Sequence, residues 1–211
     1  MARTRATDYD DKRRAILDRS AELFAEHGYD RASMSKIAEA CGVSKANLYH
    51  YYKDKEALLF DVIRFHLEEL LEVVEAADRP DLAADDRLRE LVAALLEAYR
   101  DADAQHNVQI NGMRLLPTDR QAELKAVERD LVKIFSDAVA GVAPQLKGTK
   151  LLKPVTMSLF GMINWHYLWF KSTGEITRAD YAALVSRLIV DGTRNLQAEP
   201  AAASRRISAA E

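Results

Sequence analysis

Apolar residues recur at spacings of three and four along most of the chain, which is the period of an α-helix. In residues 16–24 and again in residues 58–73 the apolar positions form one stripe between polar faces. Glycine and proline are sparse and fall between these periodic segments. The alternation that marks a β-strand is almost missing. The pattern therefore predicts an all-α chain of about nine helices.

The expected helices begin at capping side chains and end at glycine or before proline. Two capping boxes are predicted, one from Thr118 with Gln121 and one from Thr177 with Asp180. The apolar segment Pro154–Phe170 is expected to lie in one deeply buried helix. The predicted helices are a first one from Asp8 to Gly28, three capped by Ser33, Ser44 and Asp54, amphipathic ones near 84–102 and 104–115, and others at 118–141, 151–172 and 177–197.

Residues 33–51 carry the most specific pattern in the chain. Two short helical segments are joined by the sequence Cys41-Gly42-Val43-Ser44. Glycine suits the sharp turn, valine anchors the turn to the core, and serine caps the next helix. This is the punctuation of a helix-turn-helix, whose second helix lies in the major groove of DNA.

The second helix of this motif, expected at about 45–51, divides into an inner and an outer face. Leu48 should face inward against Ile37 and Val43. Lysine, asparagine and tyrosine on the outer face suit phosphates and base edges, and a helix N-terminus attracts phosphate. The candidate DNA-binding residues are Ser33, Ser35, Ser44, Lys45, Asn47, Tyr49, His50 and Lys55.

Composition narrows the possible partners without deciding between them. The 211 residues carry a net charge of −3, so any affinity for nucleic acid must come from a local patch. The single cysteine, Cys41, excludes an internal disulfide and fits a reducing cytoplasm. The sequence contains no run of about 18 uncharged apolar residues, so no membrane span is predicted. Glycine-turned helical hairpins also occur in proteins that never touch DNA, so spacing alone leaves both interpretations open.

A resemblance favours DNA binding. Residues 9–60 resemble the N-terminal domain of TetR-family transcriptional regulators over a long, ordered set of motifs. Asn47 and Tyr52 depart from the residues usual in the family, and the first of these could alter the operator sequence. The matching stretches are Ile16–Phe24, Gly28-Tyr29, Ser33–Ala38, Cys41–Lys45, Leu48–Tyr52 and Lys55–Leu59.

The resemblance implies a homodimer that binds a palindromic operator, usually to repress, and that a small ligand releases. It implies a DNA-binding domain at 1–60, a ligand-binding and dimerisation domain at 61–197, and a tail at 198–211 that we expect to be disordered. As in the family, the last two helices should form the dimer interface, although many of these residues could instead be internal core. The candidates are Leu159, Met162, Ile163, His166, Phe170, Tyr181, Leu184, Val185, Leu188 and Ile189.

The effector site is predicted from composition. Bulky residues on the central helices suit an apolar ligand, although such residues are more often ordinary core. The aromatic segment 160–170 is similar to that of family members that sense acyl-CoA thioesters. His66 and His106 are too isolated in the sequence to indicate a metal site. The candidate ligand-binding residues are Phe65, Tyr99, Asn111, Met113, Arg114, Phe135, Trp165 and Trp169.

Two other classes of function fit the sequence less well. An enzyme on a helical scaffold would need a nucleophile with a base, a phosphate loop or an acid pair in an apolar setting, and the sequence offers none of these. A DNA-binding protein without a ligand should have a basic body, whereas residues 60–104 are rich in acid. A ligand-responsive regulator, with no cofactor and no metal, fits the sequence best.

Overall fold

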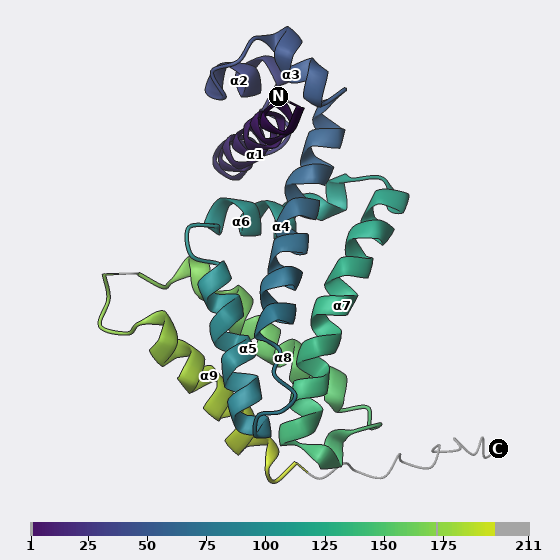
Figure 1. The fold of residues 1–211 in the computed structure, drawn as a ribbon. Helices are drawn as coiled ribbons and strands as arrows, with labels where there is room; N and C mark the ends of the chain where they lie inside the picture. Colours follow the sequence, from purple (N-terminus) through teal and green to yellow (C-terminus); the bar gives the residue numbers. More distant parts are fainter. Residues whose placement is uncertain (1, 172, 197–211) are drawn as a thin grey trace, which may run out of the picture. The chain divides into compact units, whose positions relative to one another are not determined.

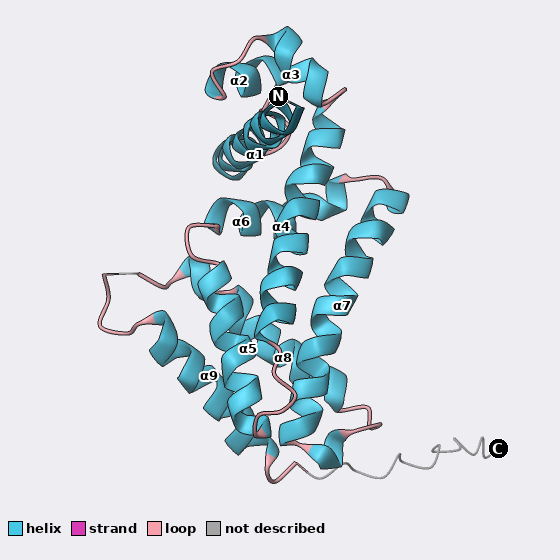
Figure 2. Cartoon of the chain, in the orientation of Figure 1, coloured by secondary structure: helices cyan, strands magenta, loops and turns pink. Residues whose placement is uncertain are grey.

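The computed structural model describes residues 2–171 and 173–196, and within them every regular element is helical (Figure 2). This confirms the all-α prediction. The predicted tail at 198–211 lies outside the described residues. The α-helices are α1 (Ala2–His27), α2 (Met34–Ala40), α3 (Lys45–Tyr51), α4 (Lys55–Ala77), α5 (Ala84–Ala98), α6 (Asp103–Gly112), α7 (Thr118–Val142), α8 (Leu152–Asn164) and α9 (Arg178–Thr193). Three 3₁₀ turns are η1 (Met113–Leu115), η2 (Pro144–Leu146) and η3 (His166–Leu168).

The chain forms two compact units. The first comprises Met1–Ala77 and Ala94–Val132, and the second comprises Asp78–Ala93 and Lys133–Glu211. Helix α4 belongs wholly to the first unit, together with α6 and the first half of α7 (Figure 1). The functional boundary expected near residue 60 stays a prediction, because compactness does not test it.

The caps of the helix-turn-helix form as predicted. The Ser33 and Ser44 hydroxyl oxygens accept hydrogen bonds from the backbone N–H groups of Lys36 and Asn47, at 3.3 and 3.1 Å. Asp54 Oδ1 accepts from the N–H of Ala57 at 2.7 Å and so caps α4. Gly42 adopts φ +65°, a left-handed conformation that glycine adopts without steric cost. Each short helix therefore begins at a side chain that satisfies one of its free amides.

Packing in the first unit follows the predicted apolar stripes. The inner face of α4 repeats at helical spacing and is buried against α1 and α6. Leu48 is fully buried in the same core as Ile37, as predicted, with Val43 packed against that core. Helix α6 approaches α4 closely, since a Cβ atom built on Gly112 would lie 3.1 Å from Leu59 Cδ1. Glycine at this position therefore permits the packing.

Two predicted N-terminal caps are wrong, although α7 itself begins at Thr118 as predicted. Helix α1 begins at Ala2, so Asp8 lies inside it and does not cap it. Alanine and arginine are strong helix formers, which explains the extension towards the N-terminus. Helix α7 includes Thr118, and the Gln121 side chain donates to the Leu116 carbonyl at 2.9 Å instead of completing a capping box. In contrast, the predicted box of Thr177 and Asp180 at the start of α9 is confirmed.

The helix predicted over 151–172 is also wrong in its second half. Helix α8 ends at Asn164, and the chain continues as the 3₁₀ turn η3. Trp165, Leu168 and Trp169 are 54%, 61% and 51% exposed, so the segment is not one buried helix. Apolar residues continue across the break in the sequence, so their spacing alone does not reveal where α8 ends. No glycine or proline marks residue 165.

Smaller differences concern helix ends. The helix expected to reach residue 102 stops at Ala98, and α9 stops at Thr193. Asp101 follows α5 with φ +60°, which explains why the helix does not continue into α6. Among the described residues, the structure contains no helix that is both long and apolar enough to traverse a lipid bilayer.

Candidate nucleic-acid interface and effector site

Helix α3 presents a polar outer face. Lys45, Asn47, Tyr49 and His50 are all exposed, whereas Leu48 between them is fully buried. The Lys45 amine lies 5.9 Å from the centre of the Tyr49 ring, so the two side chains share one side of the helix. The outer face of α3 therefore exposes the amine of Lys45, the amide of Asn47 and the phenol of Tyr49 to solvent.

The capping serines keep a donor for a phosphate. Ser33 and Ser44 are exposed, and each accepts one backbone N–H with its hydroxyl oxygen. A hydroxyl that accepts a hydrogen bond can still donate its own proton. Ser35 is exposed in the first turn of α2. The three predicted serines are thus available at the starts of the two short helices.

Lys55 is less free than its sequence position suggested. Its amine donates to the Tyr29 carbonyl at 2.6 Å and lies 4.0 Å from the centre of the Tyr29 ring. A second carbonyl, of Asp30, lies 3.5 Å away. These contacts join the start of α4 to the turn between α1 and α2. A phosphate contact from Lys55 would have to share the amine with these carbonyls.

Two contacts that anchor the end of α3 are not predictable from local sequence patterns. Tyr9 of α1 stacks on Tyr51 with ring centres 4.7 Å apart. Arg13 donates to the Tyr52 hydroxyl at 3.1 Å and pairs with Asp61 of α4. Burial and then the negative charge of Asp61 raise the pKa of Tyr52, so its phenol stays protonated. Both anchors connect residues far apart in sequence, which periodicity cannot detect.

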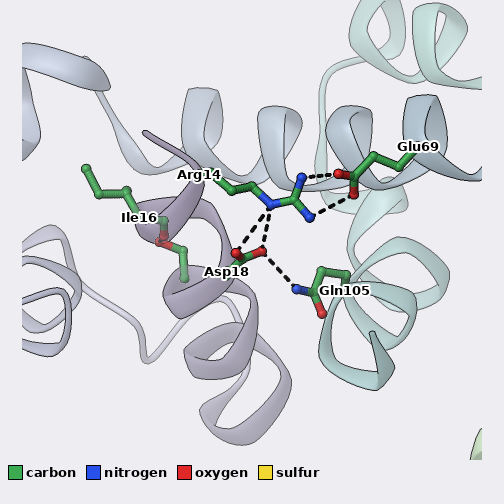
Figure 3. A network of polar contacts seen from close by, with 6 residues as sticks. Arg14, Ile16, Asp18, Glu69 and Gln105 are labelled. Atoms are coloured by element: carbon green, nitrogen blue, oxygen red, sulfur yellow. Dashed lines mark hydrogen bonds and ion pairs between the residues drawn. The ribbon is translucent and has the colours of Figure 1, made fainter. Parts of the chain in front are cut away.

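A polar network connects α1, α4 and α6 (Figure 3). Arg14 pairs with Glu69 of α4 and lies 3.2 Å from Asp18 one turn along α1. The Gln105 amide of α6 donates to the same Asp18 carboxylate at 3.1 Å. The hydrogen bond from Arg14 to Glu69 is the main reason that the pKa of Arg14 is raised. The network therefore fixes the register of α1 against the two helices that pack on it.

The predicted effector residues divide between the two units. Phe65 is half-buried beneath the guanidinium groups of Arg13 and Arg64, which lie 4.6 and 5.2 Å from its ring centre. Met113 packs at the edge of the first unit's core. Asn111 and Arg114 are exposed and line one hollow together. The first unit thus holds a pair of predicted residues at a cavity and others in packed positions.

Tyr99 belongs to a buried cluster with the two histidines. Its ring centre lies 4.3 Å from that of His106 and 6.3 Å from that of His66. Burial, followed by the charges of His106 and Arg14, lowers the pKa of His66 to about 3. Thus the two histidines, distant in sequence, meet in the fold. No group of three or more potential metal ligands occurs in the described part of the chain.

In the second unit the predicted effector residues have different surroundings. Phe135 is fully buried edge-on against Phe160, with ring centres 5.0 Å apart. Trp165 stacks on Tyr167, and Trp169 meets Tyr181 edge-on at 4.9 Å. Both tryptophans are about half exposed. Phe135 is therefore core, whereas the tryptophans lie at the surface of this unit.

The predicted dimer residues fall into a buried and an exposed set. Tyr181 is buried and donates its hydroxyl proton to the Met162 carbonyl at 2.9 Å, which ties α9 to α8. Met162 and Phe170 are half-buried, and Leu184 and Leu188 are 48% and 53% exposed. The other buried members are Leu159, Ile163, His166, Val185 and Ile189.

Comparisons with known proteins cover most of the chain. Residues 16–62 match the family described as "Bacterial regulatory proteins, tetR family", and residues 81–193 match "Tetracyclin repressor-like, C-terminal domain". A TetR-family transcriptional regulator from Bordetella parapertussis 12822 is 34% identical, with a TM-score of 0.80 over 89% of this chain and 98% of that one.

Two further relatives are a repressor and a protein solved with a ligand and DNA. The repressor Rv1474c of Mycobacterium tuberculosis is 35% identical over 94 residues, so the match spans 42% of this chain and 50% of that protein. AibR, solved with isovaleryl coenzyme A and operator DNA, is 27% identical with a TM-score of 0.73, over 85% of this chain and 98% of that one. These relatives are transcriptional regulators and not enzymes.

Proposed function

Since this chain belongs to the TetR family of transcriptional regulators, we propose that it is a repressor that binds a palindromic operator as a homodimer and is released by a small effector. The observation that carries the proposal is the outer face of α3. Its four exposed polar side chains stand on a helix that is held by the buried Leu48 and capped by Ser44. Such a helix can enter a major groove without exposing its core.

Individual roles on α3 are proposed from chemistry. Asn47 suits a bidentate contact with adenine, and Tyr49 suits a phosphate or a thymine methyl group. Lys45 neutralises a phosphate or contacts guanine. Ser33, Ser35 and Ser44 donate to backbone phosphates, and His50 lies at the far end of the same surface. Lys55 contributes chiefly by holding the turn between α1 and α2, with a phosphate contact as its second role.

We propose that the exposed apolar residues of α8, η3 and α9 form the pairing surface. Leu184 and Leu188 are one helical turn apart on α9, and Met157 is exposed on α8. Residues such as Val185 and Tyr181 are buried within one chain and hold the two helices together. Only the exposed set is available to a second copy, so the pairing surface is narrower than the sequence prediction.

We propose a small hydrophobic effector, with a CoA thioester as the first class to test. The isovaleryl coenzyme A bound by AibR supports this class. The exposed Trp165 and Trp169 of the second unit offer flat apolar surfaces to such a molecule. Phe135 acts as core against Phe160, and Tyr99 packs on the two buried histidines.

Fluorescence anisotropy with a DNA duplex from the region upstream of the gene that encodes this protein tests the proposal. We expect binding at about 0.15 M salt that bulk competitor DNA does not abolish, and that an acyl-CoA weakens. The variant Asn47→Ala should relax selectivity at one base pair. Binding equal to that of random DNA would instead indicate an architectural protein and would overturn the repressor assignment.

A further inference from the structure

A hollow in the first unit lies between the turn after α1 and the end of α6. One wall is formed by residues 27–31 and the other by residues 107–115, and its volume is about 430 Å³. Phe24, Leu59 and Val108 give it an apolar floor and are themselves buried. The hollow thus combines an apolar base with walls from two elements that are distant in sequence.

The walls carry more cations than anions. Arg31 and Arg114 stand on opposite walls, and Asp30 is the one carboxylate among the lining residues. Arg31 donates its Nε to the His27 carbonyl at 2.8 Å, which holds the side chain along the turn and leaves the Nη groups as donors. Arg114 is exposed and makes no ion pair or hydrogen bond with the described residues. Two guanidinium groups are therefore available here to an anion.

Another hollow of the same unit shows the opposite balance. Its walls include Asp18, Glu22, Glu69, Glu72 and Asp101, against Arg14 and Arg100. The Arg14 guanidinium there is already held by Asp18 and Glu69 (Figure 3). An anion would meet repulsion in that hollow and attraction between Arg31 and Arg114. The charges of the first unit therefore favour an anion in the hollow between Arg31 and Arg114 over the acidic hollow beside Arg14.

Both walls are joined to the DNA-binding elements. The Arg31 carbonyl accepts a hydrogen bond from the Lys36 amine of α2 at 3.4 Å. Tyr29, in the same turn, accepts from Lys55 at the start of α4. On the other wall Gly112 lies against Leu59 of α4. A ligand that sets the distance between the walls thereby acts on α2 and α4.

We propose that this hollow binds the anionic group, phosphate or carboxylate, of the effector, with Arg31 and Arg114 on its two sides. This inference rests on the proposed function, because it assumes a regulator that responds to a small ligand. Asn107 and Asn111 supply amide groups at the same wall as Arg114. The ligand of this hollow is thus an amphipathic anion whose charged group lies between the two arginines and whose apolar part lies over the floor of the hollow.

Backbone NMR titrations with pyrophosphate and with octanoate, at constant ionic strength, test the proposal on the full chain. We expect saturable shifts of the Gly28 and Gly112 amides with at least one probe, and the successful probe identifies a phosphate or a carboxylate. Arg114→Gln should weaken binding by about tenfold or more, since it removes a charge-assisted hydrogen bond. Arg129 is an exposed arginine outside the hollow, so Arg129→Gln should leave the affinity for the probe unchanged.

Operator binding without any probe separates the two proposals. If Arg114→Gln binds operator DNA like the unchanged chain but loses the probe, the anion site is supported. If neither probe shifts Gly28 or Gly112, or if Arg114→Gln and Arg129→Gln behave alike, the anion site is overturned while the repressor assignment stands. Failure to bind operator at all contradicts the proposed function independently.

Discussion

The helix-turn-helix (residues 33–51) and the pair of helices α8 and α9 expose opposite kinds of surface. On α3 the buried Leu48 is apolar and the large exposed side chains are polar, whereas Met157 of α8 and Leu184 and Leu188 of α9 are exposed although large and apolar. Exposed apolar patches on a folded chain mark surfaces that another molecule covers. This contrast is the reason for placing the proposed pairing surface on the second region and not on the first.

Changing α9 should give the largest effect. Leu188→Glu places a charge on the proposed pairing surface, and twofold symmetry introduces it twice. If each leucine contributes about 2 kcal/mol to pairing, the free energy of dimer dissociation falls by about 4 kcal/mol. The dissociation constant then rises roughly a thousandfold. Light scattering over a dilution series measures this. A Leu188→Glu chain that stays dimeric would show that the two regions do not differ in the way proposed.

Arg187→Glu provides the matched control. Arg187 is a neighbouring exposed residue of α9 with a polar side chain. If it dissociates the dimer as strongly as Leu188→Glu, charge and not loss of apolar contact explains the result.

Leu48→Ala tests the inner side of the helix-turn-helix. Leu48 is fully buried, so its truncation leaves a cavity and should lower the free energy of unfolding by about 3 kcal/mol. Urea denaturation monitored by circular dichroism measures the loss. A change within experimental error would mean that α3 is not anchored by this residue.

Acid should destabilise the first unit, which contains His66 and the helix-turn-helix. The folded-state pKa of His66 is about 3, below an unfolded value near 6.5, so the unfolded chain binds the extra proton between these values. Stability is then full above pH 6.5 and falls as the pH decreases, by about 2 kcal/mol at pH 5. Urea denaturation midpoints at pH 7 and pH 5 test this. Between these pH values the His66→Gln variant should lose less stability than the unchanged chain. An equal loss in both proteins would exclude His66 as the cause.

The outer side of α3 should matter only for DNA. Tyr49→Ala removes an exposed ring and should weaken operator binding by about 1–2 kcal/mol while leaving the unfolding midpoint unchanged. Anisotropy titration and thermal melting measure the two quantities. If Tyr49→Ala lowers stability as much as Leu48→Ala does, the division into inner and outer faces is wrong.

Sequence punctuation explains why one region was predicted well and the other was not. Ser33, Gly42 and Ser44 each act within four residues, so the caps and the turn follow from local chemistry. The end of α8 has no such marker, and apolar spacing continued past it. The contacts of Arg13 with Tyr52 and Asp61, and of His66 with His106, depend on tertiary packing. They join residues that no local pattern relates.

The candidate sites differ in the same manner. The exposed positions on α3 follow from helical period once Leu48 is placed inward. Side-chain bulk predicts the apolar effector residues, and bulk cannot distinguish a buried Phe135 from an exposed Trp169. Arg31 and Arg114 line the same hollow only because α1 and α6 pack together, which no local sequence pattern predicts.

Selection of binding sites from a library of random duplexes tests the central claim most directly. A homodimer that presents two copies of α3 should enrich an inverted repeat whose half-sites lie about one helical turn apart. Enrichment of such a repeat, lost at one base pair with Asn47→Ala, is the predicted result. A single unrepeated site, or no enrichment over the starting library, would contradict the assignment of this chain as a symmetric operator-binding repressor.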